Sequence, residues 1–225
     1  GRAQGAQAEA AGLAPSVLMN PILIKPKQDS EAQIITLGVP YADMSATAYR
    51  RDFLPGAVSI VRDCIKQLKE QYEILVIEGA GSPAEINLKD RDIVNMKTAE
   101  LADAPVLMAA DIDRGGVFAS LIGTLELLEP HERQRVKGFI INKFRGDIGL
   151  LQSGLDFLSQ RTGIPVLGVV PYVHDHGIDE EDSVCLSEKN GWGAEQAPIR
   201  VAVMQLPRIS NFTDINAFIG LPDTR

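Results

Sequence analysis

Short apolar runs alternate with helical patterns along most of this chain of 225 residues. The runs predict strands at Ile22–Ile24, Ile74–Ile77, Val106–Ala109, Phe139–Ile141, Val166–Val170 and Ile199–Leu206. Helical periodicity predicts helices near residues 57–72, 93–103, 116–129 and 149–161. Because this alternation is typical of βαβ units, we expect an α/β fold with a doubly wound, mostly parallel sheet.

Three segments lie outside that alternation. Residues 2–11, rich in Ala and Gln, predict a further helix, and Gln33–Leu37 before Gly38-Val39-Pro40 predicts a strand and turn inserted as a small hairpin. Residues 175–197 carry an acidic cluster at 179–182 and predict a linker. The run that begins at Ile199 is then expected to open a second domain.

The composition excludes some classes of protein. With 45% hydrophobic and 23% charged residues the chain is an ordinary globular one, and no apolar run approaches the roughly 20 residues of a membrane helix. A net charge of −8 argues against non-specific nucleic-acid binding. Cys64 and Cys185 form no ligand cluster, which fits a reducing cytoplasm. Cys64 lies in a helical apolar stripe and is predicted to pack in the core.

Glu78 ends the run Ile74–Ile77 and precedes the small residues Gly79-Ala80-Gly81-Ser82. A strand end in a parallel sheet places this acid at the carboxyl edge, where open α/β sheets bind ligands. The small residues let a ligand approach the backbone, and the carboxylate can hold Mg²⁺ against a nucleotide phosphate. The alternative is a buried structural Glu, which is costly without a partner.

Other predicted strand ends bring polar residues to the same edge. They are Lys25 with Asp29 four residues on, Asp111 with Asp113, and Asn142 with Lys143. A Lys suits phosphate, and carboxylates from separate strands suit a Mg²⁺ that keeps several waters. Any single strand end can be polar simply because the chain meets water there. Together they predict a phosphate site.

Two turns add to this site. Asp113-Arg114-Gly115-Gly116 opens a predicted helix, where backbone N–H groups favour an anion, although a helix N-cap with an exposed Arg is the alternative. The amide of Asn142 can pair with a purine edge.

His174 and His176 predict the start of a solvated linker rather than a metal site, because two His side chains without further ligands do not complete a metal site.

Five segments in a fixed order carry a family resemblance. They are residues 1–4 (Gly-Arg-Ala-Gln), 19–26 (Met-Asn-Pro-Ile-Leu-Ile-Lys-Pro), 78–88 (from Glu78 to Leu88), 111–120 (from Asp111 to Ser120) and 138–147 (from Gly138 to Asp147). This set resembles the cobyric acid synthases, the glutamine-dependent amidotransferases of cobalamin biosynthesis. Their synthetase domain resembles dethiobiotin synthetase, which implies a sheet of the P-loop NTPase type.

The resemblance implies an activity and its ligands. In the family, ATP phosphorylates carboxylates of adenosylcobyrinic acid a,c-diamide, and ammonia from glutamine displaces the phosphate to give amides at positions b, d, e and g. Such an enzyme is a glutamine-hydrolysing carbon–nitrogen ligase of the cytoplasm with ATP and Mg²⁺ as cofactors. Its partners are the corrinoid and glutamine, with no nucleic acid and no membrane.

The resemblance also implies roles for residues. Glu78 and Asp29 contribute to the Mg²⁺ and phosphate site, and Lys25 faces the γ-phosphate. Asp111 and Asp113 line the same cleft, while Asn142, followed by Lys143, reads adenine. Ser82, Asn87 and Arg114 are candidates for the corrinoid side.

Two departures from the family suggest a piece of a longer enzyme. The family's P-loop is expected before Gly1, and the nucleophilic Cys of a glutaminase is expected beyond residue 225, since neither Cys64 nor Cys185 has its position. The expected division is a synthetase domain at 1–185, a linker at 186–198 and the start of an amidotransferase domain at 199–225. We therefore expect the chain alone to be inactive.

Two other functions stay open at this point. A ligase like dethiobiotin synthetase would use CO₂ and no glutaminase, but the amidotransferase opening after residue 199 speaks against it. A deviant P-loop switch ATPase of the partitioning type would work by nucleotide-gated dimerisation. Such ATPases usually have an Asp followed by paired prolines where this chain has Glu78-Gly79-Ala80-Gly81.

Overall fold

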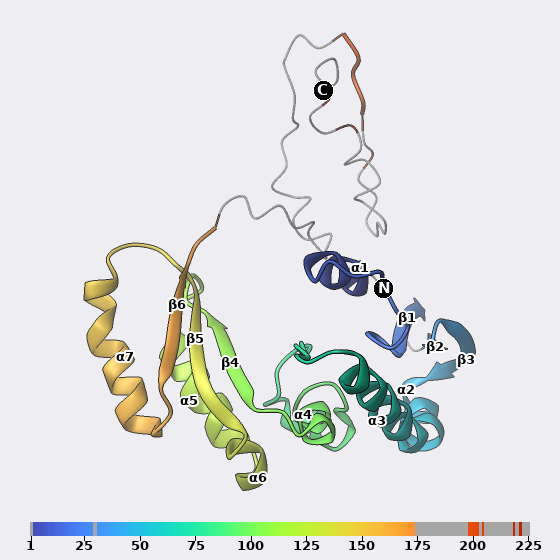
Figure 1. Ribbon diagram of the computed structural model, residues 1–225, viewed down its shortest axis with the longest axis horizontal. Coiled ribbons are helices and arrows are strands. Elements are labelled where there is room, and N and C mark those ends of the chain that lie inside the picture. Colours follow the sequence, from blue (N-terminus) through green and yellow to red (C-terminus); the bar gives the residue numbers. More distant parts are fainter. Residues whose placement is uncertain are drawn as a thin grey trace. The chain divides into compact units, whose positions relative to one another are not determined.

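The computed structural model describes residues 2–28, 31–173, 198–202, 204, 218 and 221. The chain divides into two units. The first unit consists of residues 1–14 together with residues 176–225, and the second unit consists of residues 15–175. The first unit contains the predicted N-terminal helix, α1 (Arg2–Ala10). All other elements belong to the second unit, shown in Figure 1.

The second unit contains a parallel sheet of three strands. Its order is β4 (Val106–Asp111), β5 (Val136–Phe144) and β6 (Val166–Pro171), which Figure 1 shows side by side. Between them the chain forms α5 (Val117–Leu127), the short α6 (Pro130–Arg133) and α7 (Ile148–Thr162). The predicted α/β fold, these three strands and the helices near 116–129 and 149–161 are confirmed.

The two faces of this sheet differ. On one face Phe139 and Ile141 are fully buried and share a core with Leu121 of α5 and Leu158 of α7. On the other face Leu107 and Leu167 are 50% and 57% exposed, on either side of Gly138, where a Cβ atom would overlap the Leu167 side chain. Since strands alternate their side chains between faces, the helices α5 and α7 cover a single face.

A second, antiparallel sheet precedes the parallel one. It has the order β1 (Ile22–Gln28), β2 (Glu31–Thr36) and β3 (Val39–Ser45), so the predicted hairpin is confirmed as β2 and β3. The chain continues through α2 (Ala46–Ala48) and the π-helical turn η1 (Tyr49–Phe53) into α3 (Leu54–Gln71). Ile34, Phe53 and Ala57 form the core between sheet and helix.

Two strand predictions are corrected. Ile22–Ile24 forms a strand but pairs with β2 in the antiparallel sheet, so the prediction that it belongs to the parallel sheet is wrong. Ile74–Ile77 forms no strand, and Ile74 and Val76 are 79% and 90% exposed. A strand requires a neighbouring backbone to pair its N–H and C=O groups, and an apolar pattern does not supply that neighbour.

The remaining helices follow the sequence pattern. After the irregular segment 72–85 come the 3₁₀ turn η2 (Ile86–Arg91) and α4 (Met96–Ala102), within the helix expected at 93–103. Cys64 of α3 is buried, as predicted, and burial raises the pKa of its thiol. No helix among the described residues is long and apolar enough to cross a membrane.

Other predictions fall largely on residues that the structure does not describe. Ile199–Ala202 and Met204 form no strand apart from an isolated bridge at Ile199, and the rest of the expected strand 199–206 lies outside the described residues. The predicted linker, the histidines at 174 and 176, Cys185 and the domain boundaries at 185 and 198 also involve that region. They stay predictions.

Candidate functional site

The carboxyl edge of the parallel sheet brings four of the predicted site residues together. Asp111 is the last residue of β4 and lies opposite Asn142 of β5 in the sheet register. The Nζ of Lys143 lies 2.9 Å from Asp111 Oδ2, and the N–H of Asp113 donates to Asp111 Oδ1 over 2.8 Å. Of the four strand ends predicted to meet at one edge, the structure thus brings two together, those of Asp111 with Asp113 and of Asn142 with Lys143, and the binding roles of these residues stay predictions.

Each carboxylate at this edge is paired with a cation. Lys143 lowers the pKa of Asp111 by hydrogen bonding to its carboxylate, and the backbone N–H of Asp113 adds to that shift. Arg145 Nε lies 3.2 Å from Asp113 Oδ1, and its guanidinium lies over the ring of Tyr172, 3.5 Å from the centroid. Because both negative charges are offset locally, they do not prevent the edge from binding an anion.

The turn after β4 has the expected helix-opening geometry. Gly115 and Gly116 have φ angles of +77° and +69°, which glycine adopts without the steric cost of a Cβ. Gly116 is the N-cap of α5, and no side chain caps that helix among the described contacts. Arg114 is exposed in this turn. Both the anion-binding interpretation and the simple N-cap with an exposed Arg fit this arrangement.

The backbone holds the Asn142 amide in one orientation. Lys143 has a φ of +59°, and its N–H donates to Asn142 Oδ1 over 2.9 Å. Oδ1 accepts this one main-chain hydrogen bond and keeps a second lone pair, so Asn142 can offer a base edge that acceptor as well as its Nδ2 donors. The amide therefore has the donors and the acceptor that the purine-reading hypothesis requires.

The Glu78 segment forms a separate group of the second unit. Glu78 is exposed in the irregular stretch before Gly79, so the prediction that it ends a strand is wrong. The loop that follows it lines a cavity of about 510 Å³, here called the loop cavity. Its walls include Ala80, Gly81 and Ser82 from the loop, and apolar residues of the antiparallel sheet such as Ile24, Ile34 and Met44.

Asn95 holds this loop by side-chain hydrogen bonds. The N–H of Ala80 donates to Asn95 Oδ1 over 3.1 Å, and Asn95 Nδ2 donates to the C=O of Ala80 over 2.8 Å. Asn95 Nδ2 also donates to Asp92 Oδ2 over 2.9 Å. No sequence pattern singled out Asn95 or Asp92, because both lie at or just before the start of the helix expected at 93–103 and the partner of Asn95, Ala80, is 15 residues earlier.

Other predicted residues lie away from these two groups or outside the description. Lys25 is exposed within β1, between Ile24 and Pro26, which both line the loop cavity. Since side chains alternate along a strand, Lys25 points away from that cavity. Asn87 is exposed in η2. Asp29 lies outside the described residues.

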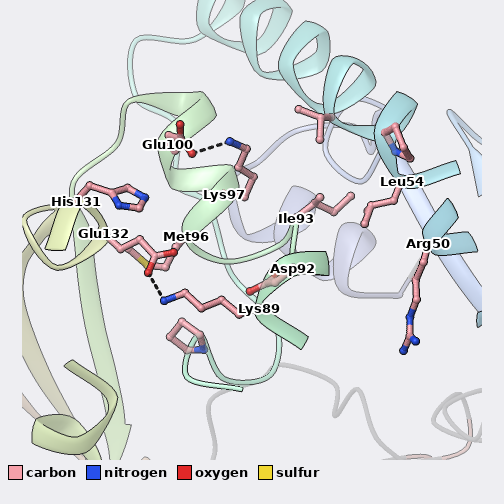
Figure 2. Close-up of a pocket in the computed structure, with 13 residues that line it drawn as sticks. Arg50, Leu54, Lys89, Asp92, Ile93, Met96, Lys97, Glu100, His131 and Glu132 are labelled. Carbon is pink, nitrogen blue, oxygen red and sulfur yellow. Dashed lines mark hydrogen bonds and ion pairs between the residues drawn. The ribbon is translucent and has the colours of Figure 1, made fainter. Parts of the chain in front are cut away.

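A second cavity, also of about 510 Å³, lies among η2, α4, α6 and the start of α3 (Figure 2). Most of its charges are paired: Lys89 lies 2.9 Å from Glu132, which raises the pKa of Lys89, and Lys97 lies 2.8 Å from Glu100. None of the predicted site residues lines it. Since α6 leads into the first residue of β5, this cavity is near the amino edge of the sheet rather than the carboxyl edge.

The donor set for Mg²⁺ is small. Among the described residues no group of three or more His, Cys, Asp or Glu side chains could hold a metal ion. Mg²⁺ in phosphate-transfer sites usually takes only one or two carboxylates and completes its shell with water and phosphate oxygens. A single exposed carboxylate such as Glu78 fits that mode, whereas a cage made wholly by protein does not.

Comparison with known proteins places the chain in a family. A family model described as an AAA domain matches residues 26–178. The chain belongs to that AAA domain family. It is 69% identical to the cobyric acid synthase of Desulforamulus reducens over 99% of its length and 43% of that protein. It is 57% identical to the one of Geobacillus kaustophilus, over 100% of the chain and 45% of that protein.

A third relative is less similar in sequence. The chain is 52% identical to the cobyric acid synthase of Yersinia enterocolitica, over 100% of the chain and 44% of that synthase. The predicted resemblance to cobyric acid synthases is thus confirmed, and the chain spans less than half the length of these relatives. No solved structure matches it.

Proposed function

We propose that the enzyme to which this chain belongs is a cobyric acid synthase. It amidates the b, d, e and g carboxylates of adenosylcobyrinic acid a,c-diamide, using ATP and ammonia released from glutamine. The identity of 69% to such a synthase over 99% of the chain carries this proposal. The paired charges at the carboxyl edge of β4 and β5 support it, because that edge is where α/β sheets bind nucleotides.

The chemistry has two steps. A carboxylate oxygen of the corrinoid attacks the γ-phosphorus of ATP, ADP leaves, and an acyl phosphate forms. Ammonia then attacks the acyl carbon, inorganic phosphate leaves, and the nitrogen loses a proton to give the amide. Positioning and charge neutralisation are the main contributions that a protein makes to phosphoryl transfer.

The nucleotide would be held by two groups of residues. Asn142 would offer its side-chain amide to adenine, and Lys143, Asp111 and Asp113 would line the cleft beside it. Glu78 and Asp29 would hold Mg²⁺, which neutralises charge on the phosphates when it is bound. Lys25 would approach the γ-phosphate. The Lys25 side chain points away from the loop cavity in this structure. Its proposed role therefore requires the γ-phosphate to lie on the other face of β1.

The corrinoid would lie against the loop cavity. The cavity combines an apolar wall from the antiparallel sheet with polar groups of the loop, among them Ser82, and a corrinoid combines an apolar ring edge with carboxylates. Asn87 and Arg114 stay candidates for carboxylate contacts because both are exposed. This assignment makes the Glu78 loop the meeting point of nucleotide and corrinoid.

The remaining parts of the activity would lie outside the described residues. We propose a synthetase domain at 1–185, a linker at 186–198 and an amidotransferase domain that begins at 199. Relatives more than twice as long leave room for a P-loop and a glutaminase. Glutamine would then be a partner of that domain, and the 225-residue chain alone would form no amide.

The test is ammonia-dependent amide formation. The whole enzyme, at the length of its relatives, would be given ATP, ammonium chloride and adenosylcobyrinic acid a,c-diamide, and ADP and corrinoid amides measured by chromatography. We expect one ADP for each amide group formed, hence four ADP per fully amidated corrinoid, and neither product from the 225-residue chain. Robust turnover by the short chain would contradict the proposed division. ATP-gated dimerisation without corrinoid binding would favour a switch ATPase, and CO₂-dependent ADP release without ammonia would favour a ligase like dethiobiotin synthetase.

A further inference from the structure

We propose that Asn95 is a positioning residue that fixes the loop after Glu78 for catalysis. The inference rests on the proposed function, because the loop matters only if Glu78 and Ser82 face the reactants. Asn95 itself lines the loop cavity, but no contact of its side chain with a reacting atom is part of this proposal. It acts through the backbone of Ala80, which is two residues from Glu78.

The side chain of Asn95 supplies Ala80 with the two backbone hydrogen bonds that a neighbouring strand would otherwise make. Residues 74–80 form no strand in this structure, so the N–H and C=O of Ala80 are not satisfied by sheet pairing. The carboxamide of Asn95 has the donor and acceptor of a peptide group, and it bonds both polar groups of Ala80 at 3.1 and 2.8 Å. This single side chain therefore fixes the loop where the backbone offers no partner.

The hydrogen bonds also decide which way the carboxamide faces. Ala80 N–H can only donate, whereas the Ala80 carbonyl and the Asp92 carboxylate can only accept. Oδ1 must therefore face the N–H, and Nδ2 must face both acceptors, as the structure has it. Asp92 Oδ1 in turn accepts the N–H groups of Val94 and Asn95 over 2.8 and 3.1 Å. Asp92 thus orients the side chain that orients the loop.

Helix capping does not explain this residue. Asn95 is the N-cap of α4, where an Asn side chain commonly accepts an N–H of the first turn. Here its side chain makes no capping hydrogen bond and is used for Ala80 instead. Replacing Asn95 therefore leaves the hydrogen bonds of α4 in place and changes the loop.

Gly79 provides an independent sign of the close fit. A Cβ atom added at Gly79 would overlap Oδ1 of Asn95 and lie 3.3 Å from its Cγ. A side chain at position 79 would therefore push the carboxamide off Ala80. Since the offending atom is the end of a side chain rather than backbone, removal of that side chain relieves the overlap. Gly79 and Asn95 should consequently behave as one unit.

The experiment compares Asn95→Ala, Gly79→Ala, the double variant and Gly168→Ala in the whole enzyme. Gly168→Ala is the matched control, since nothing lies within 4 Å of an added Cβ there. Because a small misplacement of a reacting group is costly, we expect Asn95→Ala to lower kcat for ammonia-dependent amidation by about 10- to 100-fold. The KM for ATP should stay within about twofold, because Asn95 does not contact the nucleotide in this proposal. Gly79→Ala should have a similar effect, and the double variant should be no worse than Asn95→Ala.

Hydrogen exchange tests the contact without any activity. The Ala80 amide should exchange at least about tenfold faster in Asn95→Ala than in wild type and Gly168→Ala, because its acceptor is gone. Unchanged exchange would overturn the contact. Faster exchange with unchanged kcat, or additive losses in the double variant, would overturn the positioning role. If the wild-type enzyme formed no amide at all, the proposed function would fall and the positioning role with it, while the exchange result would still decide whether the contact exists.

Discussion

Asp111 and Glu78 both follow a short apolar run, yet the structure treats the two runs differently. The run before Asp111 is β4, paired with β5 along its length, and the run before Glu78 is an irregular segment whose Ile74 and Val76 are largely exposed. The acids accordingly differ, since Asp111 is fixed by sheet register and by Lys143, whereas the loop after Glu78 is fixed by one Asn side chain. An apolar run thus becomes a strand only where a neighbouring backbone completes its hydrogen bonds.

The strongest test of the comparison is the core beneath β5. Phe139 is fully buried, so Phe139→Ala should lower the free energy of unfolding of the chain by about 3–5 kcal/mol, measured by urea denaturation. Phe157→Ala in α7 is the control, because that ring is 56% exposed, and it should cost less than about 1 kcal/mol. Equal losses for the two variants would show that the parallel sheet is not where the stability lies.

Glu78→Gln tests whether the irregular segment carries chemistry. If its carboxylate acts on the transferring phosphate as proposed, the variant of the whole enzyme should lose at least about 100-fold in ammonia-dependent amidation. Glutaminase activity should survive. Glu73→Gln, another exposed acid of the same stretch, should retain normal turnover. Near-normal amide formation by Glu78→Gln would remove Glu78 from the site and leave the edge of β4 and β5 as its only centre.

Asn142→Ala tests the edge itself. Loss of the base contact should raise the KM for ATP by about tenfold and reduce discrimination between ATP and GTP, while the KM for the corrinoid stays the same. The measurement is steady-state kinetics with both nucleotides in competition. Lys137→Ala, exposed near the opposite end of the same strand, should change neither value. Unchanged nucleotide selectivity would make Asn142 part of the scaffold.

Val76→Ala gives the smallest expected effect and the sharpest contrast with Phe139. Its side chain is 90% exposed, so the free energy of unfolding of the 225-residue chain should change by less than about 0.5 kcal/mol in urea denaturation. A loss of about 2 kcal/mol or more would show that residues 74–77 are buried, as the apolar pattern first predicted.

Much of the parallel region could be predicted from the sequence. Local apolar patterns predict the strands β4, β5 and β6 and the helices α5 and α7. The meeting of Asp111, Asp113, Asn142 and Lys143 follows from them. Once strands are parallel neighbours, their last residues lie at one edge, so the polar residues that follow must meet. The roles of those residues in binding ATP stay predictions.

Only the tertiary structure decided which backbones pair. The sequence predicted strands at Ile22–Ile24 and Ile74–Ile77, but the first paired with the next strand, β2, in the antiparallel sheet and the second paired with none, since pairing depends on which backbone lies alongside in the fold. The side chain of Lys25 points away from the loop cavity because its neighbours in β1, Ile24 and Pro26, line that cavity. The bonds from Asn95 to Ala80, which lies 15 residues earlier, had no local signal either. Apolar periodicity is a property of short segments and was fixed by the sequence alone, whereas hydrogen-bond partners are set by the folded backbone.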